Sequence, residues 1–256
     1  MAGRQLTDGR APGDRWRYAR ERLSQAQKPA NGVPAYTRWV NRRGARVVAA
    51  AAYALRLTPN AVTLISAALS FVGMAVLVLA PRTVLTGVVV AVLLAAGYLC
   101  DSADGQLARV SRISSRAGEW LDHVVDAFRS PSIHLAVALA ALQNSVPVLP
   151  LVAVALVYSV VTSGQFLSQI LAESLIRRAG RPQTRGGTGR SWILLPTDPG
   201  TLCWSFLLWG LPSAFTVVYG LLALIALAHS AASLRRRHRD LVAADEASRK
   251  KDASRA

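Results

Sequence analysis

The sequence predicts an all-α integral membrane protein with six transmembrane helices, preceded by an amphipathic helix that lies in the membrane interface. Two observations support this prediction. Hydrophobic residues make up 52% of the 256 residues and gather in long runs, while a net charge of +16, with only 14 acidic residues, lies mainly between and outside those runs. Such runs suit a hydrocarbon layer of about 30 Å, and a soluble domain rarely combines them with so few acids.

The chain begins with two segments that precede the apolar runs. Residues 1–35 are polar, basic and rich in Gly and Pro, without the apolar core that a signal peptide needs. We therefore expect this segment to stay in the cytosol. Residues 36–57 mix arginines, among them Arg38, Arg42, Arg43 and Arg46, with tryptophan and apolar residues, a pattern typical of an interfacial helix whose arginines face lipid phosphates.

Six apolar runs follow, and each is a candidate membrane span. They cover residues 61–79, 84–100, 121–142, 146–171, 200–211 and 215–234. The fifth is short for a bilayer, so it must either extend backward through residues 192–196 or cross a thinned region. We expect one six-helix domain, 58–234, and a basic, disordered tail, 235–256.

The distribution of Lys and Arg predicts the orientation of these spans, because positive residues are retained on the cytoplasmic side. On a six-helix path, the N-terminal segment, the connections 109–116 and 177–190 and the tail all lie on one side, and Arg82 alone lies on the other. A multi-pass protein of the cytoplasmic membrane with both termini in the cytosol is expected. The basic tail follows a span, so anionic lipid, and not nucleic acid, is its expected partner.

The connection between the second and third runs carries a patterned set of acidic and small residues. Spacings of three and four place two acids and two small residues on one helix face, and a glycine and two acids on a face of the next helix. The residues are Asp101, Asp104, Gly105, Ala108, Gly118, Asp122 and Asp126. Four carboxylates at a membrane boundary need compensating cations, and oxygen-only ligands favour Mg²⁺ or Mn²⁺. A pair of such ions could clamp a diphosphate.

Three other interpretations of these acids were weighed. The acids could pair with Arg109, Arg112 and Arg116 and simply hold helices together, but this does not explain two equally spaced acid pairs with small residues on the same faces. A Mg²⁺-dependent membrane prenyl transferase would carry two separated Asp-rich motifs. A non-enzymatic cation carrier would place its acids at mid-membrane, whereas these lie at the end of a span.

The acidic segment resembles the signature of the CDP-alcohol phosphotransferases, Asp-x-x-Asp-Gly-x-x-Ala-Arg, eight residues, Gly-x-x-x-Asp-x-x-x-Asp. All eight fixed positions are present, and a chance match at one start point is on the order of 10⁻¹⁰. The wider resemblance covers residues 28–234. It implies a dinuclear Mg²⁺ or Mn²⁺ site, a CDP-activated lipid donor, release of CMP, and a homodimer.

The resemblance also implies roles for individual residues. Asp101, Asp104 and Asp122 would ligate metal, and Asp126 would both contact metal and deprotonate the acceptor hydroxyl. The residues expected at the CDP portion are Gly105, Ala108, Arg109, Gly118, Asn60 and Thr63.

The acceptor alcohol is predicted less directly, because the signature concerns the CDP side. A polyol phosphate needs cationic groups near Asp126, and Arg129, one turn further on, is the nearest candidate, followed by Arg177 and Arg178. Residues 28–42 resemble the N-terminal segment of family members that use inositol phosphate. Such members often place Arg after Asp126 where this chain has Ala127, so inositol phosphate and glycerol phosphate both remain open.

Overall fold

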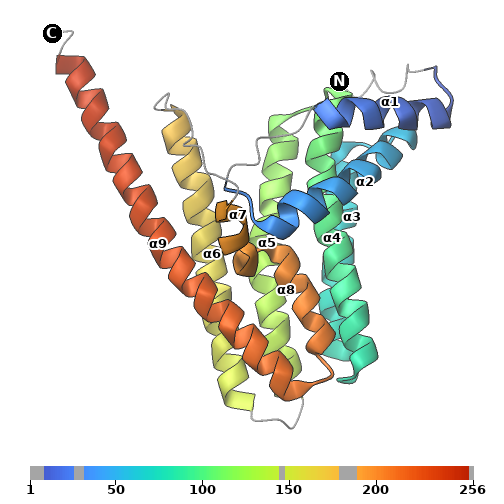
Figure 1. Ribbon diagram of the computed structural model, residues 1–256, viewed down its shortest axis with the longest axis vertical. Coiled ribbons are helices and arrows are strands. Elements are labelled where there is room, and N and C mark those ends of the chain that lie inside the picture. Colours follow the sequence, from blue (N-terminus) through green and yellow to red (C-terminus); the bar gives the residue numbers. More distant parts are fainter. Residues whose placement is uncertain (1–8, 26–31, 144–147, 179–188, 254–256) are drawn as a thin grey trace.

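The computed structural model describes residues 9–25, 32–143, 148–178 and 189–253, and in this part of the chain there are helices and no strand. Five helices are long and apolar enough to cross a membrane. They are α3 (Pro59–Leu79), α4 (Val84–Ser111), α5 (Arg116–Leu142), α6 (Val148–Arg178) and α9 (Pro212–Ala253) (Figure 1). The predicted all-α membrane fold is confirmed.

The fifth predicted span, residues 200–211, corresponds in the structure to a short helix. After α7 (Gly189–Ile193) and a 3-10 turn (Leu195–Thr197), the chain forms α8 (Pro199–Ser205) and a second 3-10 turn (Phe206–Leu208). Asp198 is extended, with φ −75° and ψ 129°, and its side chain accepts a hydrogen bond from the Gly200 N–H. This cap, with proline in the first turn, begins the helix at Pro199 and prevents the backward extension. The count is therefore five long helices and one short apolar helix.

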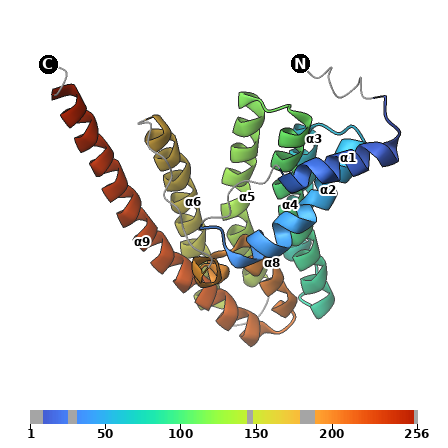
Figure 2. The same cartoon turned by 45° about the horizontal axis from the view of Figure 1, so that its top comes forward.

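The N-terminal part contains the expected interfacial helix and one helix that we did not predict. A π-helical turn (Thr37–Asn41) leads into α2 (Arg42–Ala54), and α1 (Pro12–Gln25) lies along α2 (Figures 1 and 2). Leu23 of α1 is fully buried in a cluster with α2 and α4. Arg15 donates two hydrogen bonds, of 3.1 and 2.7 Å, to the Ala54 carbonyl and so caps the end of α2. Four of the 14 residues of α1 are Arg, a good helix former, and single Ala, Glu, Leu and Gln residues add to its helix propensity despite its polarity.

The C-terminal tail is also helical, contrary to the predicted disorder. Helix α9 continues to Ala253, through residues that are mostly Arg, Lys, Ala, Leu and Glu, with no Gly or Pro to interrupt it. In both views its C-terminal half splays away from α6 (Figures 1 and 2). Closer to its start, α9 is joined to α6 by Gln165, which accepts a hydrogen bond from Ser230 at 3.2 Å.

An aromatic core fills the end of the bundle where α9 begins. The His134 ring stacks on Tyr158, with centroids 3.8 Å apart, and its Nδ1 is 2.7 Å from the Tyr219 hydroxyl. Arg82 lies over the Trp209 ring at 4.2 Å and donates to the Trp209 carbonyl at 2.8 Å. His134 is thus a packed core residue, 1% exposed.

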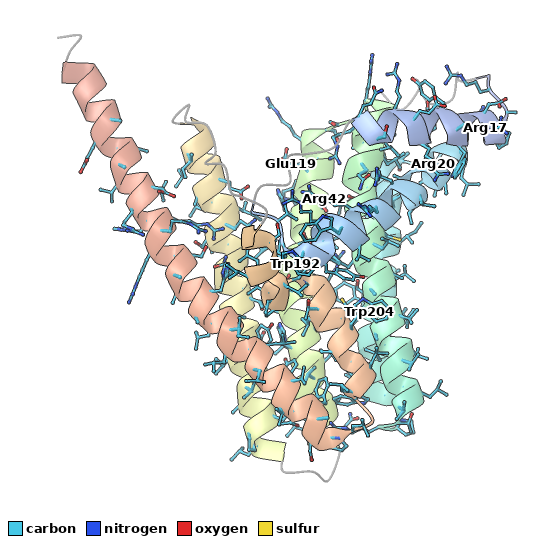
Figure 3. The ribbon with its side chains drawn as sticks, viewed as in Figure 1. Arg17, Arg20, Arg42, Glu119, Trp192 and Trp204 are labelled. Carbon is cyan, nitrogen blue, oxygen red and sulfur yellow. The ribbon has the colours of Figure 1, made fainter. Side chains whose placement is uncertain are left out.

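Buried Asp198 joins the N-terminal segment to α8. It accepts hydrogen bonds from the Thr37 N–H at 2.7 Å and from the Gly200 N–H at 3.0 Å, and the Thr37 hydroxyl lies 2.7 Å from the Tyr98 hydroxyl on α4. Burial raises the pKa of Asp198, and these hydrogen bonds oppose the rise. Figure 3 shows Trp204 on α8, whose indole N–H donates to the Tyr36 hydroxyl at 3.0 Å. We call this group the N-terminal clasp.

Candidate active site

Helix α3 packs against both α4 and α5, whereas α4 and α5 make few direct contacts with each other. Close packing of α3 on α4 depends on Gly97, since a Cβ there would lie 3.1 Å from the Ser66 carbonyl oxygen and closer still to the Ser70 hydroxyl. The two acid-bearing helices are therefore held by a shared neighbour. This leaves room between them for the acidic side chains.

The acids of the sequence motif lie on either side of a short turn. Helix α4 runs through the first part of the motif and ends at Arg112, whose φ of 56° is left-handed. Three residues later Ser115 begins α5, because its hydroxyl accepts a hydrogen bond from the Gly118 N–H at 3.0 Å. Both acid pairs therefore lie near this turn.

Three of the four predicted metal ligands converge. Single carboxylate oxygens of Asp101, Asp122 and Asp126 all lie within 4.8 Å of one another. Asp104 is near enough to interact electrostatically with Asp101 and Asp122. It is 5% exposed, and it accepts a short hydrogen bond from the Thr63 hydroxyl. An all-oxygen donor set from two helices is suited to a divalent ion such as Mg²⁺ or Mn²⁺.

Arg129 lies within this acidic cluster. Its Nη1 is 2.8 Å from Asp101 Oδ1 and 3.2 Å from Asp126 Oδ1. Its Nη2 donates to the Ser66 hydroxyl at 2.7 Å, and Ser66 donates to the Gly97 carbonyl at 2.7 Å. A cation thus links α3, α4 and α5 at the cluster, and this explains how an arginine is accommodated inside a membrane helix.

The residues predicted to bind CDP lie around the same helix ends. A Cβ at Gly118 would be 3.0 Å from Asn60 Oδ1, so the starts of α3 and α5 meet there. Among the described residues, Arg109 alone has a side chain near a Cβ added at Gly105, at 3.6 Å. Ala108 is half-buried on the same helix. The structure therefore brings Asn60 and Gly118 together, and it leaves the backbone at Gly105 open to close approach.

Some functional candidates were not predicted, and others cannot be placed. The candidates without a sequence prediction are Ser66, which lies one turn after Thr63 on α3, and Asn41, whose amide donates to the Ser102 hydroxyl at 2.6 Å beside Asp101. The only available signal was a Thr-x-x-Ser spacing on a predicted span. Arg177 and Arg178 form the last turn of α6, and their side chains lie outside the described residues.

Replacing Thr63 by valine tests the environment of Asp104. The variant keeps the shape of the side chain but leaves a buried Asp104 oxygen without its donor, which costs about 1–3 kcal/mol. We expect the dissociation constant for Mn²⁺, measured by electron paramagnetic resonance, to rise about tenfold. Thr63→Ser retains the hydroxyl and should stay within about threefold of wild type. Equal Mn²⁺ affinity of the valine and serine variants would contradict this role.

The fold and the cluster together define the class of protein: a helical membrane protein with a site suited to a divalent metal. The sequence profile of the CDP-alcohol phosphatidyltransferase family matches residues 56–234, and the chain belongs to that family. A search of curated protein sequences finds no match. The family supports CDP-alcohol phosphotransfer in phospholipid biosynthesis and the use of a divalent metal, in preference to a prenyl transferase or a cation carrier.

Proposed function

We propose that the protein transfers a phosphatidyl or similar phospho-linked group from a CDP-activated lipid, such as CDP-diacylglycerol, to an alcohol, and releases CMP. The observation that carries the proposal is the convergence of Asp101, Asp122 and Asp126 from two helices, in a chain with every fixed position of the signature. The proposed acceptor is a polyol phosphate, either glycerol phosphate or inositol phosphate.

Each acid has a proposed part in the reaction. Asp101, Asp104, Asp122 and Asp126 would hold two Mg²⁺ or Mn²⁺ ions, which supply charge neutralisation at the diphosphate. Asp126 accepts the proton of the acceptor hydroxyl as its oxygen attacks the lipid-linked phosphorus. The bond from that phosphorus to the CMP oxygen breaks, and CMP leaves with the electron pair. Asp126 suits the base role because it lies beside Asp122 in the cluster, where bound ions would favour its charged form.

The CDP portion has a proposed place at the helix ends that contain the small residues. Gly105 leaves space near the backbone for the nucleotide, Ala108 adds a small side chain on the same helix, and Gly118 allows Asn60 to approach closely. Arg109 supplies positive charge on the same helix as Gly105. Thr63 contributes by orienting Asp104.

The acceptor phosphate has a proposed site among three arginines. Arg129 is the nearest, and Arg177 and Arg178 follow at the end of α6. Arginine suits this task because its planar donors match phosphate oxygens. Arg129 is paired with Asp101 and Asp126 in the structure, so an acceptor role requires it to leave at least one of them.

We place the protein in the cytoplasmic membrane with its site and both termini facing the cytosol. In support, α1, the α4–α5 turn and the end of α9 lie at one end of the bundle (Figure 1). That end also carries most of the basic residues. A homodimer is proposed from the family resemblance, and cross-linking of purified protein in detergent tests it.

The reaction is tested with purified protein in detergent, CDP-diacylglycerol and Mn²⁺ or Mg²⁺. Release of CMP is measured across glycerol phosphate, inositol phosphate, serine and lipid acceptors, with EDTA as the control for metal. We expect acceptor-dependent CMP for a polyol phosphate and none with EDTA. Absence of CMP with every acceptor would count against the proposed reaction, and release with serine alone would count against the proposed acceptor.

A further inference from the structure

The guanidinium of Arg129 occupies the position between two of the three clustered carboxylates. Its Nη1 contacts Oδ1 of both Asp101 and Asp126, at 2.8 and 3.2 Å. Arg129 is 7% exposed, so these contacts are shielded from water. Both oxygens belong to residues of the candidate metal group. The positive charge therefore sits where divalent ions are expected to bind.

Two hydrogen bonds of Ser66 fix the position of the Arg129 guanidinium. The Ser66 hydroxyl donates a hydrogen bond to the Gly97 carbonyl at 2.7 Å. Its oxygen lone pair accepts a hydrogen bond from Arg129 Nη2, also at 2.7 Å. The Arg129 Nε is buried, and no hydrogen-bond partner for it lies in the described part of the chain. The guanidinium is thus held from one side by α3, while its Nη1 faces the acids of α4 and α5.

We propose that Arg129 is the resident counter-cation of this centre, and that divalent ions must displace its guanidinium from Asp101, Asp126 or both. The proposal rests on the metal-dependent function proposed above and adds a loading step to it. Without ions, Arg129 neutralises part of the acidic cluster. An ion binds a carboxylate oxygen at about 2.0–2.2 Å, so a guanidinium on the same oxygen would face it at close range, with strong repulsion.

The exchange has a consequence for the acceptor. Once an ion takes over a carboxylate, Nη1 of Arg129 becomes available, while Nη2 can remain on Ser66. A phosphate on the acceptor can then bind to a group that was occupied before metal loading. Metal binding would precede acceptor binding for this reason.

The experiment measures Mn²⁺ binding to purified protein by electron paramagnetic resonance, without donor or acceptor. Arg129→Gln removes the competing charge, so we expect its dissociation constant for Mn²⁺ to fall at least tenfold. Arg129→Lys keeps the charge and should remain within about threefold of wild type. Arg82→Gln is the matched control, because it removes a part-buried arginine from the connection that precedes α4, far along the helix from the acids, and its Mn²⁺ affinity should be unchanged. The Mn²⁺-induced rise in melting temperature should be larger in Arg129→Gln than in wild type.

Unchanged or weaker Mn²⁺ binding in folded Arg129→Gln overturns the proposal and leaves the proposed reaction standing. If that variant does not fold with or without Mn²⁺, Ser66→Ala decides, since loss of the anchor should tighten Mn²⁺ binding about threefold. An unchanged or weaker affinity in Ser66→Ala then overturns the proposal. Absence of Mn²⁺ binding in the wild type would instead overturn the metal centre itself, and with it the proposed function.

Discussion

Asp126→Asn should lower acceptor-dependent CMP release at least about a thousandfold. A general base contributes roughly 10²–10⁴ in rate, and this residue is also a candidate metal ligand, so two contributions are lost together. The substitution keeps the size of the side chain, and Arg129 would still have Asp101 as a partner. The measurement is CMP release with CDP-diacylglycerol and the best acceptor, at several Mn²⁺ concentrations.

The dependence on Mn²⁺ separates the two roles. Asp101→Asn alters a candidate metal ligand and leaves the proposed base in place, so raised Mn²⁺ should restore part of its activity, whereas Asp126→Asn should not recover. Glu119→Gln, which removes an exposed charge from the first turn of α5, is the control and should stay within about twofold of wild type. Recovery of Asp126→Asn at high Mn²⁺ would assign Asp126 to metal binding and leave the base unidentified.

Gly97→Ala should destabilise the protein by about 1–3 kcal/mol, the usual cost of overpacking a close contact. The added methyl would meet the Ser66 carbonyl oxygen at 3.1 Å and the Ser70 backbone nitrogen at 3.3 Å, and backbone atoms cannot rotate away. In a chain of this size 1 kcal/mol corresponds to a fall in melting temperature of about 2–4 °C. Thermal unfolding in detergent measures it.

Two other glycines serve as matched controls for that substitution. Gly164 in α6 and Gly220 in α9 have nothing within 4 Å of an added Cβ. Alanine there should be neutral or should stabilise the helix by about 0.5–1 kcal/mol. Activity adds a second distinction, because Gly97 lies one turn before Asp101 and accepts the Ser66 hydrogen bond. A Gly97→Ala protein as stable and active as the Gly164 variant would show that α3 and α4 can separate without cost.

The acidic centre could be predicted from the sequence because its information is local. Asp101 and Asp104 share a face by their spacing, as do Asp122 and Asp126, and a short turn separates the two pairs. The spacing of the acids does not predict which hydrogen-bond or ion-pair partner each side chain has. Arg129 appeared as an arginine without a partner inside a span, and only the packing of α3 against α4 and α5 reveals Ser66 and the two carboxylates beside it.

The observed fold differs from the predicted one at α1 and at the tail, and the difference at α1 arises from contacts between residues far apart in the sequence. Hydropathy identifies long apolar helices, but α1 is polar, and it is stabilised by contacts such as Arg15 with Ala54, which lie far apart in the sequence. The bond between Thr37 and Asp198 joins positions 161 residues apart, and no local pattern predicts it. The tail is helical despite its charge, because most of its residues have high helix propensity.

The acids, Arg129 and Ser66 all come from α3, α4 and α5, which follow one another along the chain, whereas α6 to α9 supply none of the clustered carboxylates. This arrangement is modular: the part proposed to hold metal and nucleotide is one continuous stretch of sequence. A chimera that keeps α1 to α5 and takes its remaining helices from a relative should retain CDP-dependent chemistry while changing its alcohol. The N-terminal clasp sets a condition for such chimeras. The relative that supplies α8 must also supply a carboxylate that can accept a hydrogen bond from Thr37.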